Sequence, residues 1–461
     1  MTDFLREFLY FVGFFYILYL IAFAAFSFFA VSVGAYRLYV SDRMLRLKNK
    51  LRHEDLPISV IVPAYNEGVT IVNSVHSILS LDYQLYEIVV IDDGSTDDTS
   101  QLLIDEFDLQ LISRPIRRVL KCQPEEAIFE ASVDGVNITL VRKKNGGKGD
   151  ALNMGINVSR FPYFVCMDAD SKFQKNSLKE IAEPVFEDDA IVAIGGMILI
   201  AQCVVMEEGH AVSYRLPPNL LVCMQAVEYN RSFLASRILM DAFNGNLIIS
   251  GAFGLFKKSI VAAAGGYSSD NLGEDMELVL RLHGFCRNND IPYRMSYQPS
   301  AICMTQAPVV LADLRKQRRR WHIGLLQSMF IHRRLLFNLK FGLVSFFSYL
   351  YYLAYELMAP VIEMFGIVTI IVASYLDILN LEYMLVFFII YAIYGAIISL
   401  SAFSQQIYTQ KFRVSYIDMF KTLLLCILEF GFFRYVLVVV RIAAIIRYGK
   451  HKSTWGQIKR V

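Results

Sequence analysis

The run from residue 8 to residue 36 constrains the fold most, because it contains no Asp, Glu, Lys or Arg. A helix needs about 20 apolar residues to cross the hydrocarbon core of a bilayer, so this run predicts a membrane-spanning helix. A secretory signal has a shorter apolar core followed by a small-residue cleavage site, whereas here Arg37, Arg43 and Arg46 follow. We therefore expect a retained membrane helix rather than a cleaved signal.

The charges that flank this helix predict its orientation. Basic residues are concentrated between residues 37 and 52, whereas the N-terminus carries Asp3, Arg6 and Glu7. Because positively charged flanks stay in the cytoplasm, the N-terminus is expected outside and the chain after Arg37 inside. The expected location is the plasma membrane, crossed more than once, with the large polar region and the C-terminus in the cytoplasm.

Composition excludes several classes of protein. Hydrophobic residues make up 55% of the 461 residues and charged residues 19%, which is too apolar for an ordinary soluble chain or a disordered one. Lys and Arg number 45 against 43 Asp and Glu, so bulk positive charge is lacking and no nucleic-acid partner is expected. The seven cysteines include no Cys-x-x-Cys pair and no Cys/His cluster, which argues against a disulfide framework or a structural zinc.

The polar region between the apolar stretches has the pattern of an α/β domain. Short runs rich in Val and Ile predict buried strands at residues 58–65, 86–93, 138–144 and 163–170. A loop and a predicted helix follow each run. This alternation predicts a doubly wound, Rossmann-like sheet, in which ligands bind beyond the carboxyl ends of the strands.

Apolar stretches return at residues 341–376, 384–403 and 417–446. Glu356 and Pro360 interrupt the first, which predicts an interfacial helix that leads into a span. Glu429 and Arg434 interrupt the third, which predicts a broken or interfacial helix, because charged residues at membrane depth face protein or water.

These patterns divide the chain into five expected segments. They are an N-terminal transmembrane helix (1–40), a basic cytosolic linker (41–56), an α/β domain (57–325), interfacial and transmembrane helices that form a channel (326–448), and a cytosolic tail (449–461).

Acidic and glycine-rich turns follow the predicted strands. Tyr65 and Glu67 follow the first and Asp93 ends the second, where such groups can hold a ribose, a base edge or a metal, although helix capping would use the same residues. The glycine-rich stretch 145–150 contains Lys148 and precedes a predicted helix, which suits a phosphate. It lacks the spacing of a Walker A loop, and a flexible turn is the alternative.

Two further acidic motifs have the chemistry of a metal site and a general base. Asp168 and Asp170 follow an apolar strand, and paired carboxylates can hold Mg²⁺ or Mn²⁺ together with a diphosphate. Glu274 and Asp275 precede an apolar helix, where they could simply complement the helix dipole. A carboxylate there can also remove a proton from an acceptor hydroxyl.

The motif at residues 317–321, Gln-Arg-Arg-Arg-Trp, closes the polar region. A basic run beside a bilayer is often only a topology signal. Gln317 can also hydrogen-bond sugar hydroxyls, Arg320 can neutralise a diphosphate, and Trp321 can stack on a sugar ring.

Taken in this order, these motifs resemble glycosyltransferase family 2, specifically its membrane-embedded processive branch of cellulose, hyaluronan, chitin and poly-N-acetylglucosamine synthases. The matching stretches are 61–67, 92–97, 147–153, 168–170, 250–256, 273–275 and 317–321. The resemblance implies a GT-A fold combined with transmembrane and interfacial helices, and an inverting UDP-sugar-dependent hexosyltransferase.

The resemblance also implies a role for each motif. It implies that the nucleotide sugar is bound by Tyr65, Glu67, Asp93, Lys148 and Asp168, and that Asp168 and Asp170 bind the Mg²⁺ or Mn²⁺ ion. It implies that Asp275, next to Glu274, is the catalytic base. The acceptor would be bound by Gln317, Arg320 and Trp321. The tail resembles the gating loop of hyaluronan synthases, which implies a gate built from Trp455, Lys459 and Arg460. It lacks the threonine of that loop, and an interfacial tryptophan is the alternative.

The implied activity is the synthesis of a β-linked polysaccharide and its export across the bilayer. The pattern around Asp275 differs from that of hyaluronan synthases, which favours UDP-glucose and a β-glucan, with a poly-N-acetylglucosamine product close behind. The alternative is a non-processive transfer from a UDP-sugar to a lipid acceptor. A transporter with a degenerate domain is disfavoured because each required acidic position is filled.

The sequence also indicates the expected partners and one segment to which no role is assigned. The expected partners are the UDP-sugar, the growing glycan and the lipid bilayer, and a homo-oligomer or an export partner is compatible with the sequence. The segment 197–246, which contains Gln225, Glu228 and Arg231, is expected to flank the acceptor site, with no role assigned to these residues.

Overall fold

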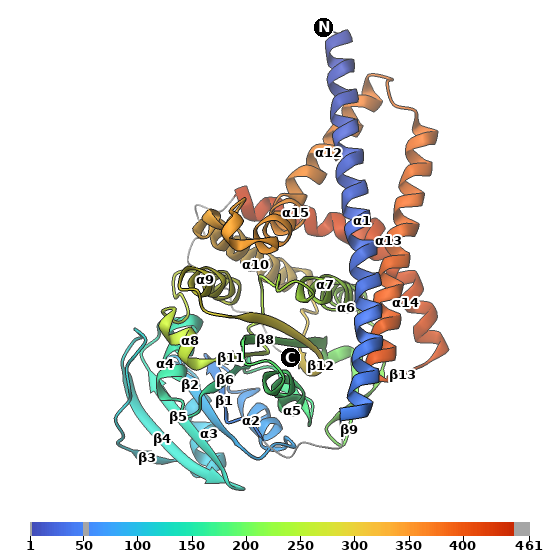
Figure 1. Cartoon of the computed structure of the whole chain (residues 1–461). Helices are drawn as coiled ribbons and strands as arrows, with labels where there is room; N and C mark the ends of the chain where they lie inside the picture. Colours follow the sequence, from blue (N-terminus) through green and yellow to red (C-terminus); the bar gives the residue numbers. More distant parts are fainter. Residues whose placement is uncertain (1, 49–54, 447–461) are drawn as a thin grey trace.

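The computed structural model describes residues 2–48 and 55–446. Its first helix, α1 (Thr2–Lys48), and a later one, α13 (Leu381–Gln410), lie side by side and project away from an α/β domain (Figure 1). A polar domain is therefore joined to a helical bundle in one structure.

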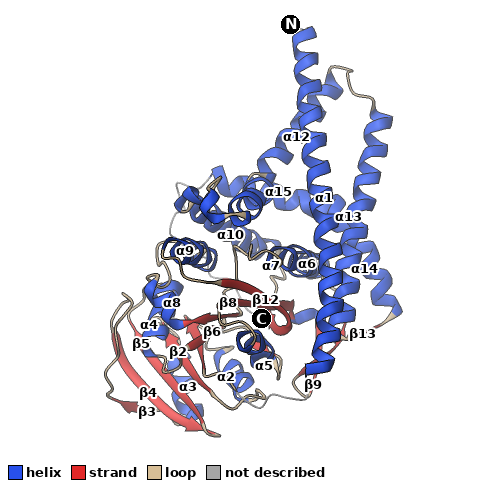
Figure 2. Ribbon diagram, in the orientation of Figure 1, coloured by secondary structure: helices blue, strands red, loops and turns tan. Residues whose placement is uncertain are grey.

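A 10-stranded sheet forms the centre of the α/β domain, in the order β3-β4-β5-β2-β1-β6-β11-β8-β12-β7. The strands run β1 (Ile58–Ala64), β2 (Tyr86–Asp92), β3 (Gln110–Ile112), β4 (Glu125–Val133), β5 (Val136–Lys143), β6 (Tyr163–Cys166), β7 (Lys172–Phe173), β8 (Ile191–Ile200), β11 (Gly254–Lys257) and β12 (Arg294–Thr305). They form the red layer of Figure 2.

The strands that the sequence predicted form the parallel part of this sheet. β1 pairs in parallel with β2 and with β6, and β2 pairs in parallel with β5. β6 is shorter than predicted and ends at Cys166, because the chain turns there and hydrogen-bonds Ser171 N–H back to the carbonyl of Asp168. This turn takes the two following aspartates out of the sheet at its carboxyl edge.

The rest of the sheet is mixed. β4 is antiparallel to β5, and β11 is antiparallel to both β6 and β8. β12 then runs parallel to β8. A second, three-stranded sheet joins β9 (Val204–Glu207), β10 (His210–Tyr214) and β13 (Arg413–Val414), so it ties the segment after β8 to the turn after α13.

Helices cover both faces of the main sheet, as the doubly wound pattern predicts. They are α2 (Ile71–Leu79), α3 (Thr99–Phe107), α4 (Lys148–Val158), α5 (Ser177–Ala182), α8 (Lys258–Ala263) and α9 (Glu274–Asn288).

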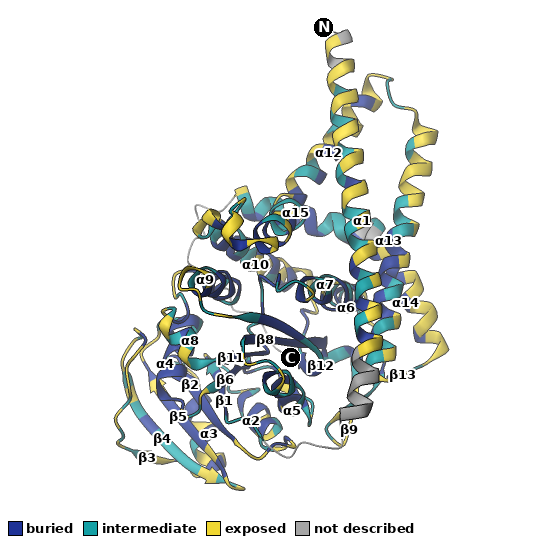
Figure 3. Cartoon of the chain, in the orientation of Figure 1, coloured by how far each residue is buried: buried dark blue, intermediate teal, exposed yellow. Residues whose placement is uncertain are grey.

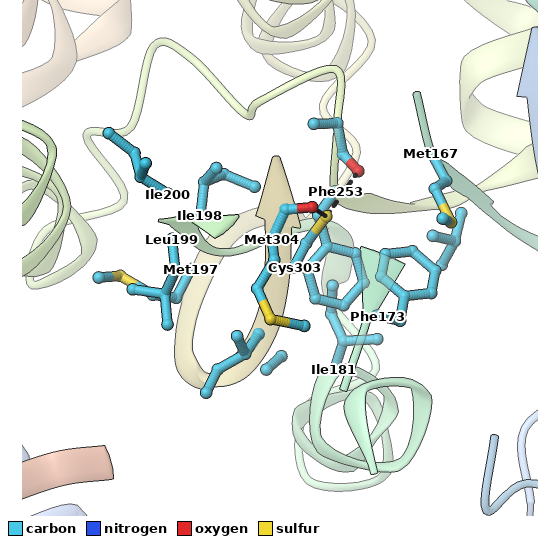
Figure 4. Packing of buried hydrophobic residues seen from close by; sticks show 14 of the residues in the cluster. Met167, Phe173, Ile181, Met197, Ile198, Leu199, Ile200, Phe253, Cys303 and Met304 are labelled. Carbon is cyan, nitrogen blue, oxygen red and sulfur yellow. Dashed lines mark hydrogen bonds between the residues drawn. The ribbon is translucent and has the colours of Figure 1, made fainter. Parts of the chain in front are cut away.

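Alternate residues of each central strand feed two separate hydrophobic cores. Val60 and Val62 pack in the core that holds α2, whereas Ile61 packs in the core that holds α4. Figure 4 shows part of the first core, where the rings of Phe173 and Phe253 are 4.5 Å apart between centroids. Burial on both faces explains why these strands are continuous apolar runs.

The rest of the helical part consists of shorter helices and helical turns. They are α6 (Leu220–Arg231), α7 (Arg237–Asp241), α10 (Leu311–Ile331), α11 (Tyr349–Tyr351), α12 (Ala359–Tyr375), α14 (Tyr416–Leu428) and α15 (Arg434–Ile446), with π-helical turns at Ser232–Ser236, Val344–Ser348, Tyr352–Leu357 and Glu429–Phe433. The last of these turns breaks the third apolar stretch at Glu429.

Within the described residues, two helices are long and apolar enough to cross a membrane, Arg6–Val40 and Leu381–Gln410. A third span results if Val344–Leu357 and Ala359–Tyr375, which meet at a bend of 48°, count as one. Exposed residues line the projecting parts of α1 and α13 (Figure 3), and they include Phe11, Phe14 and Ile390. A continuous apolar surface of this kind indicates contact with lipid.

Candidate active site

One cavity of about 1570 Å³ collects the site residues that the sequence predicted within the described chain. Its lining includes Tyr65, Glu67, Asp93, Lys148, Asp168, Asp170, Glu274, Asp275, Gln317, Arg320 and Trp321. The cavity continues to Phe23, Ser27 and Ala30 of α1. A single space therefore joins the carboxyl edge of the sheet to the helical bundle.

The loops after β1 and β2 are tied together at one end of this cavity. Asn66 donates its N–H to Ser95 Oγ (2.9 Å) and accepts the N–H of Thr96 on its Oδ1 (2.8 Å). Thr70 Oγ1 donates to the carboxylate of Glu67 (2.9 Å). Tyr65 lines the cavity beside them and is 42% exposed, so its side chain is open to a ligand.

Asp93 makes more contacts than its predicted role requires. Its buried carboxylate pairs with Lys143 and accepts the N–H groups of Gly146 (3.0 Å) and Gly147 (2.7 Å). Burial raises the pKa of Asp93, while Lys143 opposes that rise. Asp93 therefore shapes the glycine-rich loop, and Gly147 adopts a φ of 88°, which favours glycine.

Lys148 is the first residue of α4 and the central cation of the site. Its Nζ lies 2.5 Å from Asp168 and 3.7 Å from Glu274. Burial alone would lower the pKa of Lys148, but the charges of Asp168 and Glu274 hold it above its ordinary value. The ammonium at the helix N-terminus therefore stays charged, which suits a diphosphate.

Asp168 and Asp170 stand where the chain leaves β6. Burial, and then the neighbouring charge of Asp168, raise the pKa of Asp170 to about 6. In the described part of the chain, no group of three or more His, Cys, Asp or Glu residues could enclose a metal ion by itself. Two carboxylates fit a hard cation that takes its remaining ligands from a diphosphate and water.

Glu274 and Asp275 begin α9 and face different surroundings. Glu274 is buried next to Lys148, and burial raises its pKa while Lys148 opposes that rise. Asp275 is partly exposed to the cavity, and its oxygens accept N–H groups from Gly251 (3.3 Å) and Met276 (2.8 Å). The backbone thus orients the carboxylate of Asp275, and Glu274 is bound to the cation.

α10 brings Gln317, Arg320 and Trp321 to the cavity. Gln317 Oε1 is buried and accepts no hydrogen bond from the described residues. Trp321 is 39% exposed. An unsatisfied acceptor beside an open aromatic face has the chemistry that binds a sugar.

The structure also reveals a pair that sequence analysis did not connect. Arg318 on α10 donates two hydrogen bonds to the carboxylate of Glu228 on α6, both 2.7 Å long. The same guanidinium lies 4.7 Å from the centre of the Trp321 ring. The rings of Tyr229 and Trp321 are 6.3 Å apart between centroids. Arg318 was visible as a charged residue of the motif, but its partner is 90 residues away.

Two other ion pairs, each with a buried carboxylate, line the cavity toward the helical bundle. Arg231 pairs with Glu429 (2.6 Å), and Arg434 pairs with Glu363. The charges that interrupt the apolar stretches thus face protein, as expected. The predicted gating residues Trp455, Lys459 and Arg460 lie outside the described residues.

Comparison with known proteins gives the class to which this fold and site belong. Residues 163–400 match the family described as "Glycosyl transferase family group 2", and residues 59–121 match the family described as "Glycosyl transferase family 2". The first match alone covers more than half of the 461 residues. The chain belongs to glycosyltransferase family group 2.

Named relatives are similar over part of their length. The poly-beta-1,6-N-acetyl-D-glucosamine synthase of Staphylococcus epidermidis (strain RP62A) is 29% identical over 287 residues, which are 61% of this chain and 58% of the relative. That of Staphylococcus aureus (strain COL) is 29% identical over 270 residues, 58% of this chain and 54% of the relative. The match therefore spans less than two thirds of these relatives.

A solved structure shares the overall fold. The mannosyltransferase PcManGT from Pyrobaculum calidifontis, in complex with GDP-Man and Mn²⁺, superposes with a TM-score of 0.53 at 16% identity. The match covers 93% of this chain and 97% of that one. The GT-A fold and its helical additions are thus confirmed.

Proposed function

We propose that this chain is an inverting, processive glycosyltransferase that polymerises a β-linked polysaccharide from a UDP-sugar and passes the product across the membrane. The observation that supports this most is the shared cavity: its lining runs from Asp168 and Lys148 past Trp321 to Ser27 on α1. A transferase that only met a soluble acceptor would have no need for that continuation.

The donor that we propose is UDP-N-acetylglucosamine. The named relatives are poly-beta-1,6-N-acetyl-D-glucosamine synthases, and these comparisons do not support the preference for glucose that the sequence motifs suggested. A β-1,6-linked N-acetylglucosamine polymer is therefore the proposed product.

The proposed reaction is a single displacement at the anomeric carbon. The acceptor hydroxyl oxygen forms the new bond, the bond to the diphosphate oxygen breaks on the opposite face, and the proton passes to the carboxylate of Asp275. Inversion gives a β linkage from an α-linked donor. Lys148 and Arg320 stabilise the negative charge of the departing UDP.

Asp168 and Asp170 would hold a Mg²⁺ or Mn²⁺ ion. When bound, such an ion neutralises part of the diphosphate charge. Gln317 and Trp321 would orient the acceptor end, while Tyr65 and Glu67 would contact the nucleoside. The exposed apolar surfaces of α1 and α13 support insertion of these helices in the bilayer. The proposal puts the α/β domain on the cytoplasmic side.

A donor screen tests the proposal. Purified protein in lipid, with Mg²⁺ or Mn²⁺, is incubated in parallel with radiolabelled UDP-N-acetylglucosamine and UDP-glucose, and products are sized and digested with linkage-specific glycosidases. The Asp275→Asn variant is the matched inactive control. We expect long polymer from UDP-N-acetylglucosamine. A short lipid-linked product from either donor would instead establish a non-processive transferase.

A further inference from the structure

The proposed acceptor residues of α10 share one face of the helix with residues that contact the turn before α9, the helix that contains the proposed base Asp275. Gln317, Arg320 and Trp321 lie on the same stripe as Gly324, Gln327 and Ser328, because residues three or four apart stack along one side of an α-helix. The first half of this stripe lines the cavity, and the second half packs on the turn that precedes α9.

Two glycines bring the two backbones into direct contact. A Cβ built on Gly324 would lie 2.5 Å from the nitrogen and 2.7 Å from the Cα of Gly273. A Cβ built on Gly273 would lie 3.0 Å from the Cα of Gly324. Because these neighbours are backbone atoms rather than flexible side-chain ends, no larger residue fits at Gly324 without moving the helix away from the turn.

Hydrogen bonds on either side of the glycines fix the same contact. The Asn271 side chain donates to Ser328 Oγ (3.1 Å) and accepts the N–H of Gly273 (2.8 Å). Leu272 donates its N–H to Gln327 Oε1 (3.0 Å). Asn271 and Ser328 are both buried, so these bonds are shielded from water.

One turn further on, the same two helices meet again. His332, just after α10, lies 3.0 Å from the carboxylate of Glu277 on α9. We call this line of contacts, from Asn271 and Gly273 to Glu277 on one side and from Gly324 to His332 on the other, the α9–α10 seam. Asp275 lies inside the stretch that it holds.

We propose that the α9–α10 seam is a positioning device that sets the distance between the base Asp275 and the acceptor platform formed by Gln317 and Trp321. This rests on the proposed function, because it takes Asp275 as the base. Trp321 is three residues from Gly324, about 4.5 Å along the axis at 1.5 Å per residue, and Asp275 is two residues from Gly273.

Transfer to a glycan and hydrolysis of the donor should respond differently to a change in the seam. A glycan hydroxyl is placed by α10 and must meet a base placed by α9, so a shift between the helices separates the two. Water needs only the base and the donor. Widening the seam should therefore reduce transfer to a glycan more than it reduces hydrolysis of the UDP-sugar.

The test compares Gly324→Ala with Gly284→Ala. Gly284 lies on α9, and a Cβ there meets nothing within 4 Å, so this control adds the same methyl group without pushing on the seam. Transfer to glycan, hydrolysis of the donor and binding of UDP are measured on purified protein in lipid. For Gly324→Ala we expect at least a tenfold loss of transfer, with hydrolysis and UDP binding within about threefold of wild type and Gly284→Ala unchanged.

Ser328→Ala provides a second arm that adds no volume, in case Gly324→Ala does not fold. It removes the hydroxyl that bridges Asn271 and the carbonyl of Gly273. We expect a smaller loss of transfer, about three- to fivefold, in the same direction. Equal loss of transfer and hydrolysis in a folded variant, or no loss in either, would overturn the positioning role.

The proposed function can fail separately from the seam. If wild-type protein transfers a single sugar rather than making polymer, processive synthesis fails, while the ratio of transfer to hydrolysis in the variants still decides the role of the seam.

Discussion

Replacing Arg318 by lysine should weaken acceptor binding while leaving the donor site intact. The arginine is 4% exposed, donates two hydrogen bonds to Glu228, and lies with its guanidinium 4.7 Å from the ring of Trp321. Lysine keeps the charge but has neither the two-pronged geometry nor the flat face. Trp321 would then lose the group that packs against its ring.

The magnitude follows from the two contacts that lysine cannot reproduce. One lost hydrogen bond between charged groups is worth about 1.5 kcal/mol. Losing the stacked guanidinium adds about 0.5 kcal/mol. The sum is about 2 kcal/mol. If all of this energy serves to hold Trp321 in place for the acceptor, its loss raises the apparent KM for a glycan acceptor about 30-fold.

The assay measures transfer to a short oligosaccharide acceptor, with UDP binding as the reference. Arg319→Lys is the matched control, because Arg319 is the next residue on α10 and does not belong to the described residues that line the cavity. In a Trp455→Phe background Trp321 is the single tryptophan, so its fluorescence reports its packing directly. An unchanged acceptor KM, together with altered Trp321 emission, would refute the link between this pair and acceptor binding.

Three further outcomes test the site and the fold. Asp275→Asn should abolish transfer and leave UDP binding nearly intact, so loss of UDP binding by calorimetry would contradict its role as the base. Chelation of divalent cations should stop transfer. Asp168→Asn should reduce at least tenfold the gain in UDP affinity that Mn²⁺ gives the wild type. An equal gain in the variant and the wild type would contradict the metal role of Asp168. Burial lowers the pKa of His283 from 6.5 to about 4. Between these pH values the imidazole of His283 binds a proton in the unfolded chain but not in the folded one, so the free energy of unfolding should fall by up to about 3 kcal/mol as the pH drops from 6.5 to 4. Thermal unfolding of His283→Gln should lack that part of the pH dependence, and the exposed control His76→Gln should keep it.

The central strands and their acidic ends could be predicted because both signals are local. Val60, Ile61 and Val62 are buried on the two faces of the sheet, so they form an unbroken apolar run that a sequence displays directly. The polar residues after such runs meet at one edge, because parallel strands end there together. The positions of Asp93 and Asp168 at this edge could therefore be predicted without knowledge of the fold.

Pairings between distant residues could not be predicted. Lys143 is fully buried against Asp93, yet in the sequence it resembles an exposed residue at the end of a strand. The short strand β11 pairs antiparallel between β6 and β8, and four residues carry too little pattern to indicate that neighbourhood. In each case the stabilising partner lies tens of residues away.

The contact between α9 and α10 shows where local and distant information meet. Helical spacing alone places Gly324 and Ser328 on the stripe of Gln317 and Trp321, and that much is present in the sequence. What the sequence lacks is the partner, since a glycine in a helix costs about 1 kcal/mol and gives no sign of what approaches it. The structure supplies the backbone of Gly273 as the reason. A glycine that carries this cost beside the proposed acceptor residues is what the positioning role of the α9–α10 seam requires.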